Sequence, residues 1–480
     1  MPDSTPNARD TDTVRYEADV PVASDSDVLV VGAGPAGIAA AISSARNGAS
    51  TTLIEKNGFV GGNLTAGLVG PCMTSYSLDG EQQLIKGVFE ELVLRMEAIG
   101  GALHPSGIPA SSEYCGFIEH GHARVTPFDP EAVKLCATEM LLEAGVRLQL
   151  HTFVADTITD GASVRGVITA SKSGLEAFRA GVTVDCSADA DVAIRGGARY
   201  EQGRDEDGLT QPMTMFFRVA NVDDDVVRAY VAEHTDDFRP FASIVAKARE
   251  AGEFPVQRRG IGLYKTLDPG VWRINTSRMH RLDGTDVRDL TTGEIEGRRQ
   301  VDGLMKFFRK WLPGFENATL LDTAAMVGVR ETRRIVGDYQ LTIEDLATGR
   351  EFDDVIALCG YPVDIHSPTD DSGGVGDRYT TANIYQIPFR SLIPAGLDGV
   401  LVAGRSLSAT HEAQGATRVM PPSFAMGEAA GAAAALAVQA GVEPREVSIP
   451  ALQKTLVEQG AWLGEAVRDR VVGVAAAPAD

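Results

Sequence analysis

The sequence predicts a mixed α/β fold in which a domain with a parallel sheet and a β-meander is interrupted by a second α/β domain. Two observations lead to this fold class. Residues 27–31 form a short apolar run rich in β-branched side chains, an alanine-rich helical segment follows, and residues 50–54 form a second strand-like run. This order of elements is a βαβ unit, which has a parallel pair of strands. The alanine- and glycine-rich composition returns at Leu392, after a region from Asp205 to about Pro388 with more charged and aromatic residues.

Local signals predict the next elements along the chain. Gly48 ends the first helix, and an amphipathic helix is expected over 81–99. Asp129 and Pro130 begin a further helix, which extends to Ala144. Short runs of strand-forming residues separated by turns then predict a β-meander. Its four expected strands are 146–150, 154–159, 164–171 and 181–187.

The C-terminal elements have the composition of the N-terminal ones. A buried strand is expected over 399–403, and Pro421-Pro422-Ser423 open a helix of very small residues over 424–440. The chain therefore divides into parts, and a pocket at the junction of two domains is the usual place for a ligand. The predicted parts are a flexible segment at 1–25, a first domain at 26–75, 125–204 and 389–441, a second domain at 76–124 and 205–388, and a C-terminal helix and tail at 442–480.

Charge and hydropathy exclude several classes of partner. The 480 residues carry a formal net charge of −22, so neither nucleic acid nor an anionic lipid surface is expected to bind. No stretch reaches the roughly 18 apolar residues of a membrane-spanning helix. Residues 1–25 lack the apolar centre of a secretory signal, which predicts a cytoplasmic protein. Lysine is scarce beside arginine, and both a base-composition bias and adaptation to high salt explain this acidic composition.

The cysteines give no sign of a metal centre. They are Cys72, Cys115, Cys136, Cys186 and Cys359. None forms a C-x-x-C pair, which argues against a zinc site, a redox dithiol and an iron–sulfur ligand set. Scattered cysteines of this kind are expected to be reduced thiols.

A glycine-rich motif directly follows the first strand. Gly32, Gly34 and Gly37 have the spacing G-x-G-x-x-G where the first helix begins, and Glu55 ends the next strand. In this motif the first glycine permits a tight turn, the second lets a pyrophosphate approach the backbone, and the third lets helix and strand pack closely. A carboxylate at Glu55 favours a ribose with free hydroxyls over a 2′-phosphate. The motif therefore predicts a Rossmann-like domain that binds FAD or NAD, with an unliganded glycine turn as the alternative.

The segment after this unit distinguishes FAD from NAD. A dehydrogenase would continue with parallel strands, but here Glu55-Lys56 runs into Gly61-Gly62-Asn63 and a long excursion. With these motifs the chain resembles the glutathione-reductase-like FAD superfamily, and within it the FAD-dependent oxidoreductase family related to the flavin subunit of heterodisulfide reductase. The segments that carry the resemblance are 27–57, 61–67, 185–198, 328–342 and 387–431.

The resemblance implies a set of FAD contacts. The glycine-rich turn would hold the pyrophosphate, Glu55 the adenosine ribose, and Gly62 and Asn63 the flavin or its ribitol. Val154 would meet the adenine through its backbone. The implied contacts are Gly32, Gly34, Pro35, Ala36, Gly37, Glu55, Lys56, Gly62, Asn63, Val154, Ala188, Asp189, Gly404, Arg405, Arg418, Val419, Met420 and Gly427.

Two of these positions depart from the family pattern. Ala188 stands where relatives usually have a glycine, and Arg405 stands where many have an acid that binds a ribitol hydroxyl. The helix after Pro422 would point its N-terminus at the N1–C2=O edge of the flavin. Its partial positive charge would stabilise reduced, anionic flavin, and the small residue Gly427 would permit the approach.

Five residues are candidates for substrate chemistry. His366 and Arg418 come first, because their places are loosely similar to those of the histidine and arginine that hold a substrate carboxylate in fumarate reductases. Imidazole exchanges protons near neutral pH, and a guanidinium group can bind a carboxylate through two hydrogen bonds. Arg330 is the third candidate, in a charged cluster that is otherwise expected to be a solvated face or a salt-bridge network. His411 and Tyr385 complete the set.

Each candidate also has a structural interpretation. His366 could be a satisfied loop histidine, Arg418 could serve only the flavin O2, and His411 and Tyr385 could be purely structural. Cys72 could tether flavin covalently, although a buried free thiol is the better expectation.

The predicted function is an FAD-dependent oxidoreductase that exchanges a hydride between a small organic substrate and flavin N5, with an unidentified electron acceptor or donor. Gly373–Gly376 do not follow a strand, so no second dinucleotide domain is expected. A flavin-carrying electron-transfer subunit and an FAD monooxygenase remain as alternatives, and a homo-oligomer is compatible with either.

Overall fold

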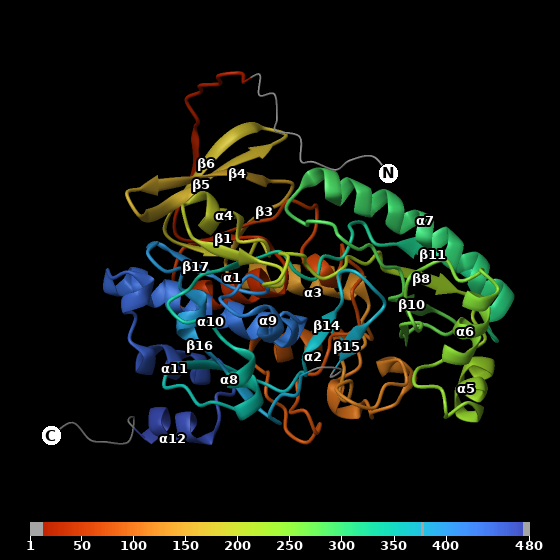
Figure 1. Cartoon of the computed structure of the whole chain (residues 1–480). Helices are drawn as coiled ribbons and strands as arrows, with labels where there is room; N and C mark the ends of the chain where they lie inside the picture. The colour runs from red at the N-terminus through yellow and green to blue at the C-terminus, as the bar shows by residue number, and fades with distance from the viewer. Residues whose placement is uncertain (1–12, 376–378, 474–480) are drawn as a thin grey trace.

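The computed structural model describes residues 13–375 and 379–473 (Figure 1). β1 (Val22–Val31), α1 (Pro35–Arg46) and β2 (Thr51–Ile54) confirm the predicted βαβ unit, because β1 and β2 pair in parallel. Residues 22–25, predicted to be flexible, belong to β1, since they pair with residues 177–179 of β6 (Gly174–Asp185). Residues 1–12 of the predicted flexible segment lie outside the described residues.

β6 connects a parallel sheet to a β-meander. Its C-terminal part pairs in parallel with β1 and with β17 (Val400–Val402), and β3 (Arg147–Gln149) adds a parallel strand beside β2. Its N-terminal part pairs antiparallel with β5 (Ser163–Ser171), which in turn pairs with β4 (Phe153–Asp160). Figure 1 shows this meander at the top of the molecule.

The meander has three strands, so the prediction of four was wrong. The segment expected to be its first strand is β3, which joins the parallel sheet. β3 follows α3 (Pro130–Glu143), a helix capped by the Asp129 side chain as predicted. A strand that is reached through a helical crossover pairs in parallel with its neighbour, and this connection decides its place.

α1 and α10 (Met420–Ala440) pack against each other and against the parallel sheet. A Cβ atom on Gly427 would lie 2.0 Å from the Ala36 carbonyl oxygen of α1, and one on Gly431 would be nearly as close to the next turn. Glycine at these two positions therefore permits the close approach of the helices. α10 begins four residues before its predicted start, because its two prolines occupy the first turn, where a missing N–H breaks no helical bond.

α2 (Val88–Ala98) is shorter than the helix predicted over 81–99. Gly87 precedes it with φ +60° and ψ −132°, a backbone conformation that only glycine adopts readily. The Val88 N–H donates a hydrogen bond of 3.2 Å to the Glu428 carboxylate of α10. The start of α2 is thus set by a tertiary contact, which the amphipathic pattern does not reveal.

A four-stranded antiparallel sheet forms a second core, on the right in Figure 1. Its order is β11 (Thr319–Thr323), β8 (Phe217–Ala220), β10 (Trp272–Ile274), β9 (Leu263–Lys265). Phe308 of the amphipathic helix α7 (Val287–Trp311) stacks on Phe217 of β8. Both side chains pack in one buried cluster with Trp272. The helices of this region are α5 (Asp224–Glu233), α6 (Ala242–Glu250) and α7 (Val287–Trp311).

Shorter elements connect the two cores. The buried side chains of β13 (Val355–Cys359) and β16 (Tyr385–Pro388) pack in the same hydrophobic cluster as those of α1 and α10. The boundary between the two domains at residue 388 stays a prediction. These elements are α4 (Asp191–Arg195), β7 (Tyr200–Gln202), β12 (Arg333–Ile335), α8 (Ile343–Thr348), β13 (Val355–Cys359), β14 (Asp364–His366), β15 (Gly373–Val375), β16 (Tyr385–Pro388) and α9 (His411–Thr417).

Two helices, α11 (Ile449–Glu458) and α12 (Glu465–Gly473), follow α10 where one C-terminal helix was expected. Residues 474–480 of the predicted tail lie outside the described residues. Of the helices that the structure describes, none is long and apolar enough to cross a membrane.

Candidate functional site

The carboxyl ends of the parallel strands open on a cavity of about 1090 Å³, called here the strand-end cavity. Gly32 follows β1, Glu55 follows β2, Cys186 follows β6 and Ala403 follows β17, and all four line it. Open α/β sheets bind their ligands at this end of the strands. The predicted FAD contacts that line this cavity are Gly32, Gly34, Pro35, Ala36, Glu55, Lys56, Gly62, Asn63, Val154, Ala188, Asp189, Gly404, Arg405, Arg418 and Met420.

Gly32 and Gly62 lie too close to neighbouring backbone to carry a side chain. Gly32 has φ +92°, and a Cβ atom there would lie 2.5 Å from the Cys186 carbonyl oxygen. A Cβ on Gly62 would lie 2.9 Å from the Cα of Gly34. Gly37 packs against the Gly32 backbone and does not line the cavity. The structure thus gives Gly37 the packing role that the motif assigns to its third glycine.

The N-termini of two helices meet the strand-end cavity. Gly34 and Val419 are the residues before the first turns of α1 and α10, and neither helix start is capped by a side chain among the described residues. Their positive ends favour an anionic group. In α10 the first turn contains two prolines without N–H groups, which leaves Met420 as its first backbone donor. Gly427, predicted to be near the flavin, instead packs on α1 and lines neither this cavity nor its neighbour.

Glu55 is held at the end of β2 with only 5% of its surface exposed. Its Oε2 atom accepts a hydrogen bond from the Ala33 N–H at 2.8 Å, and its Oε1 atom accepts one from the Asn57 N–H at 2.8 Å. Oε1 also accepts a hydrogen bond from the Asn57 Nδ2 at 2.7 Å, so the further lone pair is on Oε2. The fixed carboxylate can therefore accept from ligand hydroxyls such as those of a ribose.

The structure shows what Ala188 and Arg405 do at the two positions that depart from the family pattern. Ala188 has φ +73°, so it adopts the left-handed backbone that a glycine would, at a cost of about 1 kcal/mol. The Arg405 Nε donates to the Ala188 carbonyl at 2.8 Å, and its Nη2 pairs with Asp189 at 2.5 Å. Arg405 therefore ties the end of β17 to the loop after β6 and places a positive charge on the cavity wall.

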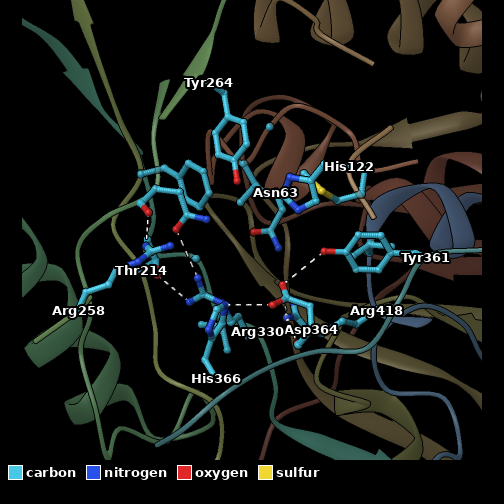
Figure 2. Close-up of a pocket in the computed structure, with 18 of the residues that line it drawn as sticks. Asn63, His122, Thr214, Arg258, Tyr264, Arg330, Tyr361, Asp364, His366 and Arg418 are labelled. Atoms are coloured by element: carbon cyan, nitrogen blue, oxygen red, sulfur yellow. Dashed lines mark hydrogen bonds and ion pairs between the residues drawn. The ribbon is translucent and has the colours of Figure 1, made fainter. Parts of the chain in front are cut away.

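A second cavity of about 780 Å³ adjoins the first, and Asn63 and Arg418 line both (Figure 2). We call it the arginine-lined cavity. The Asn63 Oδ1 atom is buried without a hydrogen-bond partner among the described residues. The remaining wall is Val69, Gly70, Met73, His122, Thr214, Phe216, Arg239, Arg258, Tyr264, Asn275, Gly328, Val329, Arg330, Tyr361, Asp364, His366 and Val419.

Positive charge dominates the arginine-lined cavity. Among the described residues of its wall, four arginines face a single carboxylate, that of Asp364. Arg330 Nη1 donates to the Pro212 carbonyl and to the Thr214 hydroxyl, both at 2.6 Å, so both of these partners are uncharged. Burial lowers the pKa of Arg330 to about 10, and the neighbouring Arg418 adds to this shift. The lowered pKa indicates that few neighbouring groups stabilise the charged form of Arg330.

His366, Asp364 and Tyr361 form a small polar group beside Arg418. His366 Nε2 lies 3.2 Å from Asp364 Oδ1, and the Tyr361 hydroxyl donates to Asp364 Oδ2 at 3.4 Å. Arg418 Nη2 lies 3.5 Å from the same carboxylate. Burial, together with the surrounding arginines, holds the pKa of His366 well below its usual value, so the imidazole is neutral at physiological pH.

The structure brings together three of the five catalytic candidates. His366, Arg330 and Arg418 line the arginine-lined cavity. His411 Nδ1 instead lies 2.8 Å from Glu331 in a buried ion-pair group outside both cavities, and the Tyr385 hydroxyl donates to the Tyr361 carbonyl at 3.0 Å. The side chains of His411 and Tyr385 therefore line neither cavity, and their polar atoms make contacts inside the protein.

Most of the arginine-lined wall was missed by sequence reasoning. Asp364 was the easiest of these residues to predict, because residues i and i+2 of a strand share a face and His366 was already a candidate. The other missed residues come from separate segments without a common spacing. They are Arg239, Arg258, Tyr264, His122 and Asn275.

The groups that line the strand-end cavity indicate which ligand it can bind. In the ranges 13–375 and 379–473, no three His, Cys, Asp or Glu side chains are grouped as metal ligands. The strand-end cavity combines a glycine turn, two helix N-termini, a fixed carboxylate and the unpartnered Asn63 amide oxygen. These features fit a dinucleotide.

Comparisons with known proteins find the following similarities. The thiamine thiazole synthase of Aeropyrum pernix is 32% identical over 143 residues, which are 30% of this chain and 43% of that protein's length. A geranylgeranyl bacteriochlorophyll reductase-like structure from Thermoplasma acidophilum is 14% identical over 95% of this chain and 92% of that chain, with a TM-score of 0.43. The L-proline dehydrogenase from P. horikoshii is 14% identical over 92% and 99%, with a TM-score of 0.43.

The model of one protein family matches residues 27–456, which include both cavities, and its description is FAD dependent oxidoreductase. The chain therefore belongs to the FAD dependent oxidoreductase family, and it is an enzyme whose cofactor is FAD.

Proposed function

We propose that the enzyme transfers a hydride between FAD and a small organic substrate bound in the arginine-lined cavity. The observation that carries this proposal is the common wall of the two cavities, to which Asn63 and Arg418 both belong. A ligand in the second cavity would therefore lie against the part of the cofactor that reaches this wall. When bound, FAD supplies the redox ring that accepts or returns the hydride.

Residues of the chain would orient the substrate and exchange its proton. Arg418 is fixed through its Nη2 by the Asp364 carbonyl at 2.9 Å, and it can orient a polar substrate group at the common wall. His366 is neutral, and its Nδ1 has no hydrogen-bond partner in the described part of the chain. It can take a proton from an alcohol or amine donor while Asp364 faces its other nitrogen.

A second cavity that adjoins the first at Asn63 and Arg418 favours this proposal over a flavin-carrying electron-transfer subunit, which would need no substrate site. Arg405 after β17, where the hydroxylase pattern has an acid, disfavours an FAD monooxygenase. The finer relationship to the heterodisulfide reductase flavin subunit and to fumarate reductases stays a prediction, as do the cytoplasmic location and a homo-oligomeric state.

Anaerobic reduction tests the proposal. A panel of small alcohols, amines and hydroxy acids is added to the FAD-loaded enzyme, and the visible flavin band is followed in a stopped-flow instrument. We expect one class to bleach the band, and Arg418→Met to slow bleaching by about tenfold or more, since a charged hydrogen bond contributes about 1.5–3 kcal/mol. The exposed Arg299→Met is the matched control. A band that no donor bleaches, with a tightly co-purifying redox partner from the native host, would contradict the proposal.

A further inference from the structure

We propose that the end of the arginine-lined cavity remote from Arg418 is a second anion subsite, formed by Arg258 and Arg239 and backed by Arg278. The substrate is then a small dianion with one acidic group at each end. This inference rests on the proposed function, because it names the substrate class of the same cavity.

The arginines are spread across the cavity. Figure 2 shows Arg258 on the left, Arg418 on the right and Arg330 between them. Asp364 lies between Arg330 and Arg418 in this view, and its ion pair with Arg418 is 3.5 Å long. The end of the cavity at Arg258 has no carboxylate among the described residues of its wall. One acidic group of a substrate could therefore meet Arg418 and Arg330, and a second could meet Arg258.

Arg258 and Arg278 are buried without a charged partner. Arg258 is 8% exposed and donates to the backbone carbonyl of Asn275, and Arg278 is 5% exposed. The Arg278 Nε atom is buried without a hydrogen-bond partner, and the guanidinium group makes no ion pair with any residue that the structure describes. Burial, followed by the repulsion of neighbouring arginines, lowers the pKa of Arg258 to about 9. The half-buried Arg239, on the cavity wall, also has no ion pair within the described ranges.

A buried arginine elsewhere in the protein shows what a structural role requires. Arg334 is 1% exposed, and its guanidinium group pairs with Glu331 and donates to the carbonyls of Ala409 and Gly203. Every charged nitrogen of Arg334 is thus used inside the fold. A buried charge without such partners is strongly destabilising, so the contrast with Arg258 points to a charge that a ligand completes.

The chemistry of the subsite fits a carboxylate or a phosphate ester. A guanidinium group presents donors in a planar fork that matches both groups through paired hydrogen bonds. Tyr264, whose pKa burial raises, adds a neutral hydroxyl donor to the same wall.

Calorimetric titration of the FAD-loaded enzyme with non-reacting probes tests the subsite. The probes are succinate, propionate and succinamide at constant ionic strength, with phosphoglycolate as the arm that distinguishes a phosphate from a carboxylate at one end. We expect succinate or phosphoglycolate to bind about ten- to a hundredfold tighter than propionate, the effect of one further charged hydrogen-bonded contact. Succinamide is expected to bind more weakly than either dianion.

Variants separate the subsite from a general effect of charge. Arg258→Met should abolish the preference for succinate over propionate while leaving propionate binding unchanged, whereas the exposed Arg299→Met should change neither. Because Arg258 is an uncompensated buried charge, its replacement should also raise the Tm of the ligand-free enzyme. A variant that unfolds at lower temperature would overturn the claim that this charge awaits a ligand.

The outcome is distinguishable from a failure of the proposed function. Dianion binding that depends on Arg258, with no bleaching of flavin by any donor, charged or uncharged, would support the subsite and contradict hydride transfer. Equal binding of succinate and propionate, with bleaching by an uncharged donor, would overturn the subsite and leave hydride transfer standing.

Discussion

The buried carboxyl group of Glu428 predicts a loss of stability as the pH rises. Glu428 is 2% exposed in α10, where its Oε2 accepts the Val88 N–H at 3.2 Å and its Oε1 has no hydrogen-bond partner in the described part of the chain. Burial raises the pKa of Glu428 from 4.5 to about 8, against smaller opposing effects of the Val88 hydrogen bond and of Arg46. The folded protein therefore holds a proton that the unfolded chain releases.

The sign and size follow from this difference. Below pH 4.5 both states are protonated and there is no penalty, whereas between pH 4.5 and about 8 only the unfolded chain ionises, which favours unfolding. Each pH unit in this window lowers the free energy of unfolding by about 1.4 kcal/mol, or by about 5 kcal/mol across it. Glu428→Gln keeps an acceptor for Val88 and removes the ionisation. The variant should therefore exceed the wild type by less than about 1 kcal/mol at pH 5 and by about 5 kcal/mol at pH 8.

Urea unfolding of the FAD-loaded protein at several pH values between 5 and about 8 measures the difference. Glu296→Gln, a change at an exposed position of α7, is the matched control and should leave the pH dependence unchanged. A stability difference between Glu428→Gln and the wild type that stays constant with pH, or a variant that is less stable at pH 8, would refute the reasoning.

Three further predictions concern the cofactor. Gly427→Ala places a Cβ 2.0 Å from the Ala36 carbonyl oxygen and forces α1 and α10 apart. This should lower the free energy of unfolding by about 1–3 kcal/mol and reduce the amount of FAD retained on purification. Gly107→Ala, whose Cβ meets nothing within 4 Å, is the control and should change neither quantity. Glu55→Gln should weaken FAD binding about tenfold in fluorescence titrations, since it replaces charged hydrogen bonds by neutral ones. Burial raises the pKa of Cys72 to about 12, so acid precipitation of the wild type should release all flavin into the supernatant, and protein-bound flavin would contradict this.

The sequence predicts those parts of the fold whose signals are local. The βαβ unit and the helix after Asp129 follow from apolar runs, glycine spacing and a capping residue, and the structure has them at nearly the same positions. β3 was predicted to pair within the meander, whereas it pairs with β2 at the other edge of the same sheet, because its pairing depends on the crossover through α3. The start of α2 was misplaced because Glu428, far away in the chain, fixes it.

The same division applies to the candidate site. The dinucleotide contacts lie in contiguous motifs, so the residues of the strand-end cavity could be named from the sequence. The arginine-lined cavity combines side chains from the inserted sheet, such as Tyr264 of β9, with others from β14 and from Arg418 and Val419, which lie between α9 and α10. No spacing along the sequence indicates that Arg258 and Arg330 line the same cavity. Their burial, which determines how well their positive charges are compensated, depends on the folded structure.

The central claim is that the cofactor and the arginine-lined cavity meet at Asn63 and Arg418. A crystal structure of the FAD-loaded enzyme soaked with succinate tests it most directly. We expect the flavin ring at this common wall, with the diacid beside it between Arg418 and Arg258. A flavin ring turned away from Asn63, or a diacid found only outside the arginine-lined cavity, would contradict it.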